Sequence, residues 1–420
     1  MRAGDSKAAR STIRTLRRRP EVRAVALAAR NRGLRGWIVG GAIRDARLGV
    51  PVPEIDVAVE SDAENLALDL ERAGWGRAVF LSRDRPGPRV FRVAGSRPVD
   101  LAEVEGGSIE TDLKRRDFTV NAIAAALETG RILDPFGGCG DLELRRLRCV
   151  DPRNLVDDPV RAARAARIYA TLGLKPDRGV LEAARRAAPG LRHAAAERVS
   201  GELSRLLGAA EAGPALAWAA RAELMPALLG LRPGEARIRG AARAVRKLDG
   251  PATAGLAPAA RRSLRLALLA SCLEMPPSRT RRWLSERRWV RREADEAARL
   301  MVLAAAARSA DGRAESWRWV LDAGPLARAA LMLLSLQSPR QAARASRLRR
   351  LARKPVRRVA VTGSDVVAWL GIPPGPAVGA LLSDLRVAAA TGAVKTRREA
   401  RHWLSGQVRR RRPPAIISAH

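Results

Sequence analysis

Hydrophobic and polar residues change their pattern along the chain near residue 140. Up to that point, short apolar runs of strand length alternate with helical segments, and turn residues such as glycine and proline separate them. The runs predict strands over residues 37–39, 54–59, 78–82, 89–94 and 99–101, a turn at 85–88, and helices over 1–30 and 63–73. After residue 140, segments rich in Ala, Leu and Arg predict helices broken by Gly and Pro. We therefore expect an α+β fold, in which a small β-sheet with helices precedes an all-helical remainder.

One stretch, residues 37–59, combines two features that suit nucleotide chemistry. An apolar run ends in Gly40 and Gly41, and Arg44 lies near the start of the helical segment that follows. Glycines allow close approach of the backbone, and free N–H groups at a helix start favour an anion. Beyond a proline-containing turn, Glu54 and Asp56 lie two apart on a predicted strand and so point to the same face. Each feature alone is also typical of an ordinary turn or a solvated strand edge, but together they predict two Mg²⁺ ions gripping a triphosphate.

This stretch resembles the signature of class II tRNA nucleotidyltransferases and bacterial poly(A) polymerases, which is an apolar strand, Gly-Gly-x-x-Arg-Asp-x-x-Leu-Gly, and then Asp-x-Asp. The chain departs from it at Glu54, where the family usually has aspartate; glutamate also ligates Mg²⁺, but its longer side chain shifts the oxygen. The resemblance implies that Glu54 and Asp56 are catalytic metal ligands. It implies a third catalytic carboxylate at Asp100, for which a strand-end salt bridge is the alternative role. The residues that it assigns to triphosphate binding are Gly40, Gly41, Arg44 and Asp45.

A second motif lies at residues 112–124. Arg115, Arg116 and Asp117, with Asn121 four residues later, suit a triphosphate or ribose site. Arginine grips phosphate through two bonds, and Asp117 can hold the guanidinium in place; a surface Arg–Asp pair at a helix start is the alternative. The string resembles the family's Arg-Arg-Asp-Phe-Thr-x-Asn-Ala motif, which implies nucleotide binding by these four residues. Residues 134–142 further resemble the family's hinge segment, Asp-Pro-x-Gly-Gly-x-x-Asp-Leu.

A third motif begins with Asp158 and a proline, a pair that predicts a helix N-cap and first turn. Capping does not explain Arg161, Arg164 and Arg167, whose spacing keeps three like charges on neighbouring parts of one face, where they repel unless something anionic faces them. The stretch is similar to the family's Glu-Asp-x-x-Arg motif, with Asp157 in place of the usual glutamate. The resemblance implies that Asp158 and Arg161 read the base of the incoming CTP or ATP in place of a template, and that the two later arginines also bind nucleotide.

A fourth motif contains Glu197 and Arg198, followed by Glu202. In a lone helix this spacing is typical of ordinary charge pairing. It also resembles the family's Glu-Arg-x-x-x-Glu-Leu motif, which implies that Glu197 and Arg198 give structural support to the base pocket. The four motifs lie in the family's order between residues 37 and 207.

The composition of the chain indicates the kind of partner that it binds and the cellular compartment in which it works. Lys and Arg number 78 against 43 Asp and Glu, and the net charge of +35 indicates a polyanionic partner. Aromatic residues make up 3% of the chain, which favours recognition of RNA by shape and phosphate over broad base stacking. The three cysteines have no metal spacing and indicate free thiols in a reducing cytoplasm. The basic N-terminus lacks the apolar region of a signal peptide, and the apolar runs are too short to span a bilayer, so we expect a cytoplasmic protein without a membrane partner. No protein partner can be inferred.

The resemblance implies a template-independent RNA nucleotidyltransferase that builds the 3′ CCA end of tRNA from CTP and ATP, with Mg²⁺ as cofactor and release of pyrophosphate. However, only eleven residues separate Asp100 from Asp112, where many family members have a longer flexible loop that helps to switch from C to A addition. A partial enzyme that adds only CC or only A, and a poly(A) polymerase, are therefore alternatives. The substitution at position 54 also permits an alternative of another class, a catalytically weak RNA-binding protein.

The resemblance and the composition together predict six parts of the chain. These are a basic N-terminal helical segment (1–30), a nucleotidyltransferase head (31–143), a helical neck for base recognition (144–210), a helical body for RNA binding (211–350), a helical tail (351–408) and a disordered basic C-terminus (409–420).

Overall fold

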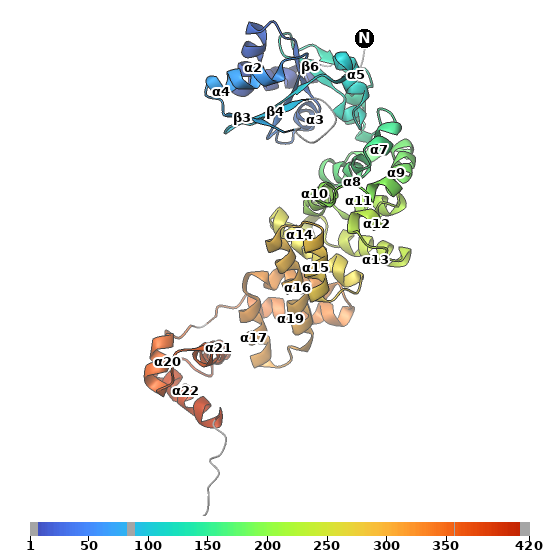
Figure 1. The fold of residues 1–420 in the computed structure, drawn as a ribbon. Helices are drawn as coiled ribbons and strands as arrows, with labels where there is room; N and C mark the ends of the chain where they lie inside the picture. The colour runs from blue at the N-terminus through green and yellow to red at the C-terminus, as the bar shows by residue number, and fades with distance from the viewer. Residues whose placement is uncertain (1–6, 82–88, 357, 412–420) are drawn as a thin grey trace, which may run out of the picture. The chain divides into compact units, whose positions relative to one another are not determined.

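A computed structural model describes residues 7–81, 89–356 and 358–411 of the chain (Figure 1). The chain forms two compact units, which divide between Ala254 and Gly255. The first unit contains a β-sheet and helices, whereas the described residues of the second unit form helices joined by loops, without a strand. The predicted α+β class is therefore confirmed. The predicted turn at 85–88 lies outside the described residues.

Seven strands in the described part of the first unit form one sheet, in the order β3-β4-β5-β2-β1-β6-β7. Their bounds are β1 Gly36–Val39, β2 Ile55–Val59, β3 Arg77–Phe80, β4 Val90–Ala94, β5 Val99–Glu103, β6 Ala124–Ala126 and β7 Ile132–Leu133. β2 and β5 run parallel, whereas the other neighbouring strands run antiparallel. The strands predicted near residues 78, 89 and 99 are confirmed as β3, β4 and β5.

Helices cover this sheet and connect its strands. They are α1 Lys7–Arg17, α2 Pro20–Asn31, α3 Gly41–Leu48, α4 Ala63–Arg72, the 3₁₀ turn η2 Glu105–Gly107, α5 Ile109–Lys114, the 3₁₀ turn η3 Thr119–Asn121 and α6 Gly138–Glu143. α4, which confirms the predicted helix at 63–73, packs on β3, β4 and β5 and also against α2 (Figure 1). Fully buried side chains on the strands and on α4, among them Ile38, Ile55, Leu66 and Leu101, form part of the apolar core of this unit.

The first unit continues as helices with one short strand pair. The elements are β8 Arg146–Leu147, α7 Arg153–Asp157, α8 Val160–Leu172, β9 Lys175–Pro176, α9 Arg178–Leu191, α10 Ala196–Gly208, α11 Gly213–Arg221, α12 Met225–Leu229, α13 Glu235–Arg246 and η4 Gly250–Thr253. α8 packs against α9, α10 and α11 through a face of buried alanines, whose small side chains allow close helix approach. The parallel pair of β8 and β9 was not predicted, because runs of two residues carry no periodicity.

The second unit contains α14 Pro258–Cys272, α15 Pro277–Glu286, α16 Arg291–Ser309, α17 Arg313–Ala323, η5 Gly324–Leu326, α18 Ala327–Ser335, α19 Pro339–Ala352, α20 Gly363–Leu370, α21 Pro376–Thr391 and α22 Arg397–Arg411. The last three helices share an apolar cluster that includes Val366, Leu381, Leu385 and Leu404. α22 continues through Arg411, so the first three residues of the segment predicted to be disordered are helical. No helix in the described ranges of either unit is long and apolar enough to cross a membrane.

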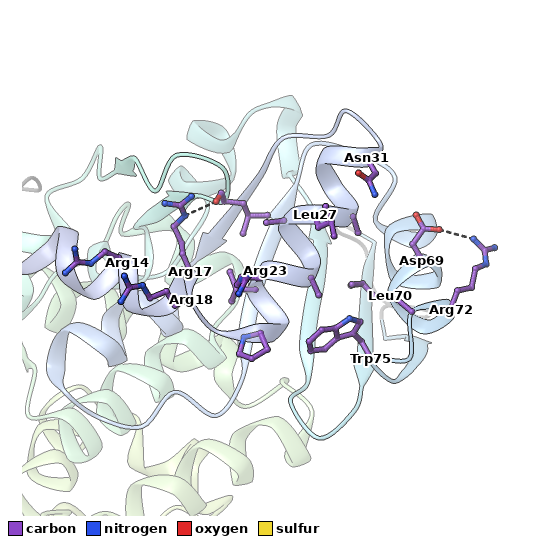
Figure 2. Close-up of a pocket in the computed structure, with 17 residues that line it drawn as sticks. Arg14, Arg17, Arg18, Arg23, Leu27, Asn31, Asp69, Leu70, Arg72 and Trp75 are labelled. Carbon is purple, nitrogen blue, oxygen red and sulfur yellow. Dashed lines mark hydrogen bonds and ion pairs between the residues drawn. The ribbon is translucent and has the colours of Figure 1, made fainter.

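A broad cavity of about 1230 Å³ lies along α1, α2 and the end of α4 (Figure 2). Basic side chains such as Arg14 and Arg18 line one part of it, and Leu27 and Trp75 line another. Asp69 is the one acidic residue of its described lining and is paired with Arg72. This cavity therefore offers no pair of carboxylates, and the predicted catalytic residues lie elsewhere.

Candidate active site

The turn after β1 depends on a glycine. Gly40 has φ +64° and ψ −122°, a conformation that residues with a side chain rarely adopt. A Cβ at this position would lie 2.6 Å from Nη1 of Arg116, so a larger residue would displace the arginine. The side chain that approaches the Gly40 backbone closely belongs to the second motif, while the predicted approach of an anion stays a prediction.

A chain of hydrogen bonds joins the first motif to the second. Arg44, buried in the first turn of α3, donates from Nη1 to Oδ1 of Asn121 at 2.5 Å and from Nε to Oδ1 of Asp45 at 2.8 Å. Asn121 in turn donates from Nδ2 to Oδ1 of Asp117 at 2.8 Å. Residues 77 positions apart are thereby held in one network, which fixes the direction of the Arg44 guanidinium.

The three candidate catalytic carboxylates lie at two neighbouring strands. Asp56 on β2 is directly opposite Asp100 on β5, while Glu54 lies one residue before β2 begins. The prediction that Glu54 belongs to the strand is therefore wrong, because the pairing with β5 starts only at Ile55. Arg92 on β4 bonds to Asp100 at 2.7 and 2.8 Å and reaches Glu54 at 3.2 Å. Asp100 thus forms the strand salt bridge that was its alternative role.

The electrostatic surroundings of Asp56 are unfavourable for a bare carboxylate. Its side chain opens to solvent, yet partial desolvation by the surrounding protein raises its pKa above the ordinary value of 3.8. Repulsion from Asp100 and, more weakly, from Glu54 acts in the same direction, while Arg116 and Arg92 oppose it. A cation bound at Asp56 would relieve both effects, because it would replace the lost hydration of the carboxylate and offset the repulsion from its acidic neighbours.

The second motif pairs with the third. The carboxylate of Asp117 is buried and accepts a hydrogen bond from Nη1 of Arg164 at 2.9 Å. Burial opposes the charge of Asp117, but Arg164 and the bonds from Asn121 and the Phe118 N–H keep its pKa below the ordinary value. Sequence reasoning expected Asp117 to hold an adjacent arginine. That expectation is wrong, because Arg116 instead pairs with Asp112 at 3.0 Å.

A buried glutamate supplies the anion that the arginines of α8 require. Glu202 on α10 accepts from Nε of Arg167 at 2.5 Å and lies 3.5 Å from Nε of Arg164. Desolvation, together with repulsion from Arg164 and Arg44, lowers the pKa of Arg167, whereas the pKa of Arg164 is raised because its carboxylate partners outweigh its burial. The like charges on α8 are therefore faced by carboxylates of the protein itself.

Asp158 does not cap α8. The helix is preceded by Pro159 without a side-chain cap bond, and Asp158 ends α7 with an extended backbone. Its carboxylate accepts from Nη2 of Arg198 at 2.7 Å and lies 3.7 Å from Nε of Arg161. The N-cap expectation is wrong. Arg161 also donates to the backbone oxygens of Arg115 and Asn154, at 2.8 and 3.2 Å.

These contacts bring most of the predicted residues to one cavity of about 300 Å³. Its lining consists of Gly40, Gly41, Arg44, Asp56, Arg116, Asp117, Asn121, Arg161, Arg164, Arg167, Glu202 and Arg205. Six arginines against three carboxylates leave the lining basic, which suits a polyphosphate. The predicted residues outside this lining are Asp45, Glu54, Asp100, Arg115, Asp158, Glu197 and Arg198. Of these, Arg115 pairs with Glu105 and Glu197 is exposed in the first turn of α10.

Arg92 and Arg205 were not predicted as functional candidates, and Glu202 was named only as part of the fourth motif. Glu202 did have a signal, since it falls on the apolar face of α10 formed by Val199, Leu203 and Leu206, and a charge at such a position needs a buried partner. Arg92 alternates with the buried Phe91 and Val93, which places it on the opposite face of β4. Its partner Asp100 could be found only from the strand pairing.

The oxygen donors fit a hard divalent cation in part. Over residues 7–81, 89–356 and 358–411, no three acidic, His or Cys side chains come together as a complete metal site. Mg²⁺, however, is commonly bound through one or two carboxylates together with substrate phosphates and water. The carboxylates of Asp56 and, directly opposite it, Asp100, with Glu54 just before β2, match that type of site.

Comparison with known proteins identifies the family. The model of the poly A polymerase head domain matches residues 36–148, which hold the sheet, the glycine turn and the carboxylates. Two curated relatives are 32% identical over 410 residues. They are the CC-adding tRNA nucleotidyltransferase of Geobacter sulfurreducens, with 91% of this chain and 94% of the relative covered, and the CCA-adding enzyme of Geobacillus stearothermophilus, with 90% and 95% covered.

Solved structures agree with this assignment. The crystal structure of the Bacillus stearothermophilus CCA-adding enzyme in complex with CTP is 29% identical, covers 92% of this chain and 96% of its own, and has a TM-score of 0.68. The Thermotoga maritima CCA-adding enzyme complexed with tRNA, at 19% identity and a TM-score of 0.72, shares the fold, with 95% of this chain and 98% of that chain covered. With its motifs assembled at one cavity, the chain belongs to the family of CC- and CCA-adding tRNA nucleotidyltransferases.

Proposed function

We propose that this nucleotidyltransferase acts in the cytoplasm on the 3′ end of tRNA, takes CTP as its nucleotide, and stops after two cytidines. The names of its relatives divide between CC-adding and CCA-adding enzymes at equal identity, so similarity alone does not decide the number of additions. The observation that carries the proposal is the link between β5 and α5. The family resemblance implies a longer flexible loop at this place in many members, where it helps to switch from C to A addition.

The link is short and held on both sides. Between the end of β5 at Glu103 and the start of α5 at Ile109, only Val104 and Ser108 lie outside a regular element. Glu105 pairs with Arg115, and Ser108 caps α5 by accepting from the N–H of Thr111 at 3.2 Å. Adenine is larger than cytosine, and its amine lies at a different place relative to the ribose. A site that accepts both bases therefore requires a part that can move. A link fixed in this way does not supply that movement.

The residues in and around the cavity would then divide the work. Arg44 and Arg116 bind the triphosphate, and Asp158 and Arg161 read the base edge. Mg²⁺ held by Glu54 and Asp56 would neutralise phosphate charge and lower the pKa of the attacking tRNA 3′ hydroxyl. The hydroxyl attacks the α-phosphate in line, and pyrophosphate leaves. The basic helices beyond residue 210, assigned above to a body and a tail, would grip tRNA through its phosphates.

Primer extension tests the number of additions. Three tRNAs, which lack the CCA end or end in C or CC, are incubated with labelled CTP, ATP or both. We expect two cytidines on the first tRNA, one on the second, and no extension of the third by ATP. Incorporation of ATP into the tRNA that ends in CC, at a rate near that of CTP addition, would favour full CCA addition. Long runs of A would indicate a poly(A) polymerase.

The metal assignment has its own test. Asp56→Ala should abolish incorporation while tRNA binding stays nearly intact, because the carboxylate serves the metal and not the RNA. Glu54→Asp, which restores the family's usual residue, is the matched variant and should keep or increase activity. Near-normal turnover of Asp56→Ala would exclude the two-carboxylate assignment, and absence of any incorporation by the unmodified protein would favour the RNA-binding alternative.

A further inference from the structure

A row of charged side chains crosses three neighbouring strands beside the cavity. Arg92 on β4 lies directly opposite Asp100 on β5, and Asp100 lies directly opposite Asp56 on β2. Residues that face one another in register point to the same side of a sheet, so one arginine and two aspartates share a face. Glu54, just before β2, adds a third carboxylate within reach of Arg92.

Arg92 holds two of these carboxylates with unequal strength. Its Nε and Nη2 form a pair of bonds to the two oxygens of Asp100, at 2.7 and 2.8 Å. Glu54 receives a single contact of 3.2 Å from the same Nη2, and its side chain is 49% exposed against 18% for Asp100. Paired bonds between guanidinium and carboxylate are stronger and more directional than single ones. Asp100 is thus held firmly and Glu54 weakly.

Asp56 is free to take a cation. In the described part of the chain, no hydrogen bond or ion pair holds its carboxylate, although the charges of Arg116 and Arg92 both act on it. A divalent cation at Asp56 would draw in the nearest carboxylate that can be released. That carboxylate is Glu54, because only one long contact to Arg92 must break.

We propose that Arg92 is a positioning residue of the metal site, which keeps Asp100 out of the metal ligands and releases Glu54 only when a divalent cation displaces their contact. The inference rests on the proposed metal role of Asp56 and Glu54. It follows that the fixed positive charge of Arg92 weakens cation binding by the free protein, since like charges repel at short range. Without Arg92, Asp100 and Glu54 would both be available to the cation.

Binding of Mn²⁺ to the full chain, without nucleotide or RNA, tests this proposal independently of activity. Free Mn²⁺ is measured by electron paramagnetic resonance. We expect Arg92→Leu to bind Mn²⁺ at least tenfold more tightly than the unmodified protein. Arg92→Lys keeps the charge but loses the fork that grips Asp100, so it should lie between the two.

Matched variants separate this role from a general loss of charge. Arg89→Leu removes the same charge one residue before β4, where Arg89 pairs with Glu64 instead, and should leave the affinity within twofold. Adding Asp100→Asn to Arg92→Leu should reverse most of the gain, because the released Asp100 is one of the groups that produces it. If the gain survives in the double variant, Arg92 does not act by withholding Asp100.

The possible failures are distinguishable. Equal Mn²⁺ affinity of Arg92→Leu and the unmodified protein overturns the inference about Arg92 while leaving the metal site intact. Equal binding by the unmodified protein and Asp56→Ala instead overturns the proposed metal site itself. Thermal unfolding in the absence of metal checks that each variant folds. If Arg92→Leu does not fold, Mn²⁺ binding is compared between the unmodified protein, Arg92→Lys and Arg92→Gln instead.

Discussion

Replacing Asp158 by asparagine separates base recognition from a purely structural role of its ion pair with Arg198. Cytosine and adenine both carry an exocyclic amine, which can donate to a carboxylate, while uracil and guanine present a carbonyl oxygen at that position. A carboxylate facing a carbonyl leaves both acceptors unmet. Asparagine can turn either its oxygen or its NH₂ group toward the base. Asp158→Asn should therefore accept bases with an amine at that position and bases with a carbonyl oxygen.

The magnitude follows from the contacts of Asp158. An unmet buried polar group costs about 1–3 kcal/mol, or roughly ten- to a hundredfold in selectivity. The Asp158 side chain is 28% exposed, and Arg198 already neutralises it at 2.7 Å, so the lower end applies. We expect the preference for CTP over UTP to fall by about tenfold, which is about 1.4 kcal/mol. Stability should change by less than about 1 kcal/mol, because Asp158 makes no cap bond and its ion pair is partly solvated.

The assay compares kcat/KM for CTP and UTP on tRNA that lacks its CCA end. Asp157→Asn is the matched control, since it makes the same change at the exposed preceding residue and should leave the preference unaltered. An unchanged preference in Asp158→Asn refutes the base-reading role. A large loss of thermal stability together with the loss of preference would show that the ion pair with Arg198 is mainly structural.

Three other outcomes follow from the structure. Asp141→Asn should lower the free energy of unfolding by about 2–4 kcal/mol in urea titrations, because the fully buried Asp141 pairs with Arg146 and Arg148. These partners lower the pKa of Asp141, so the charged side chain stabilises the fold fully at neutral pH and loses this effect as the pH falls through the lowered pKa. If Asp141→Asn destabilised the protein as much in strong acid as at neutral pH, this reasoning would be contradicted. The dissociation constant for tRNA should rise steeply with salt, given the charge of +35, and a flat dependence would exclude charge as the driving force. Burial raises the pKa of Cys139 and Cys149 to about 12, so iodoacetamide at pH 8 should label them slowly until the chain is unfolded, and rapid labelling of the folded protein would disprove it.

Local sequence patterns could predict the elements that carry the site but not their contacts. The strand, glycine turn and helix around Gly40 follow from apolar runs and from the φ that only glycine tolerates easily. The partner of Asp117 could not be predicted in this way, because Arg116 is adjacent in the sequence but Arg164 forms the bond. The packing of α8 determines which arginine pairs with which carboxylate. The buried face of α8 consists mainly of alanines, and their pattern in the sequence does not indicate which helices they contact.

The same limit explains why the arginines of α8 were read mainly as nucleotide ligands. Their spacing shows that an anion must face them, but not whether the anion is a substrate or part of the protein. Glu202 and Asp117 supply two such anions and thereby tie α8 to α10 and to the second motif. Within the cavity lining, Arg44 and Arg116 come from other elements and reach the same space. Their carboxylate partners, Asp45 and Asp112, lie outside the cavity lining, whereas Asp117 and Glu202 belong to it. We therefore expect a triphosphate to contact Arg44 and Arg116 and a divalent cation at Asp56, while Arg164 and Arg167 fix the geometry of the site.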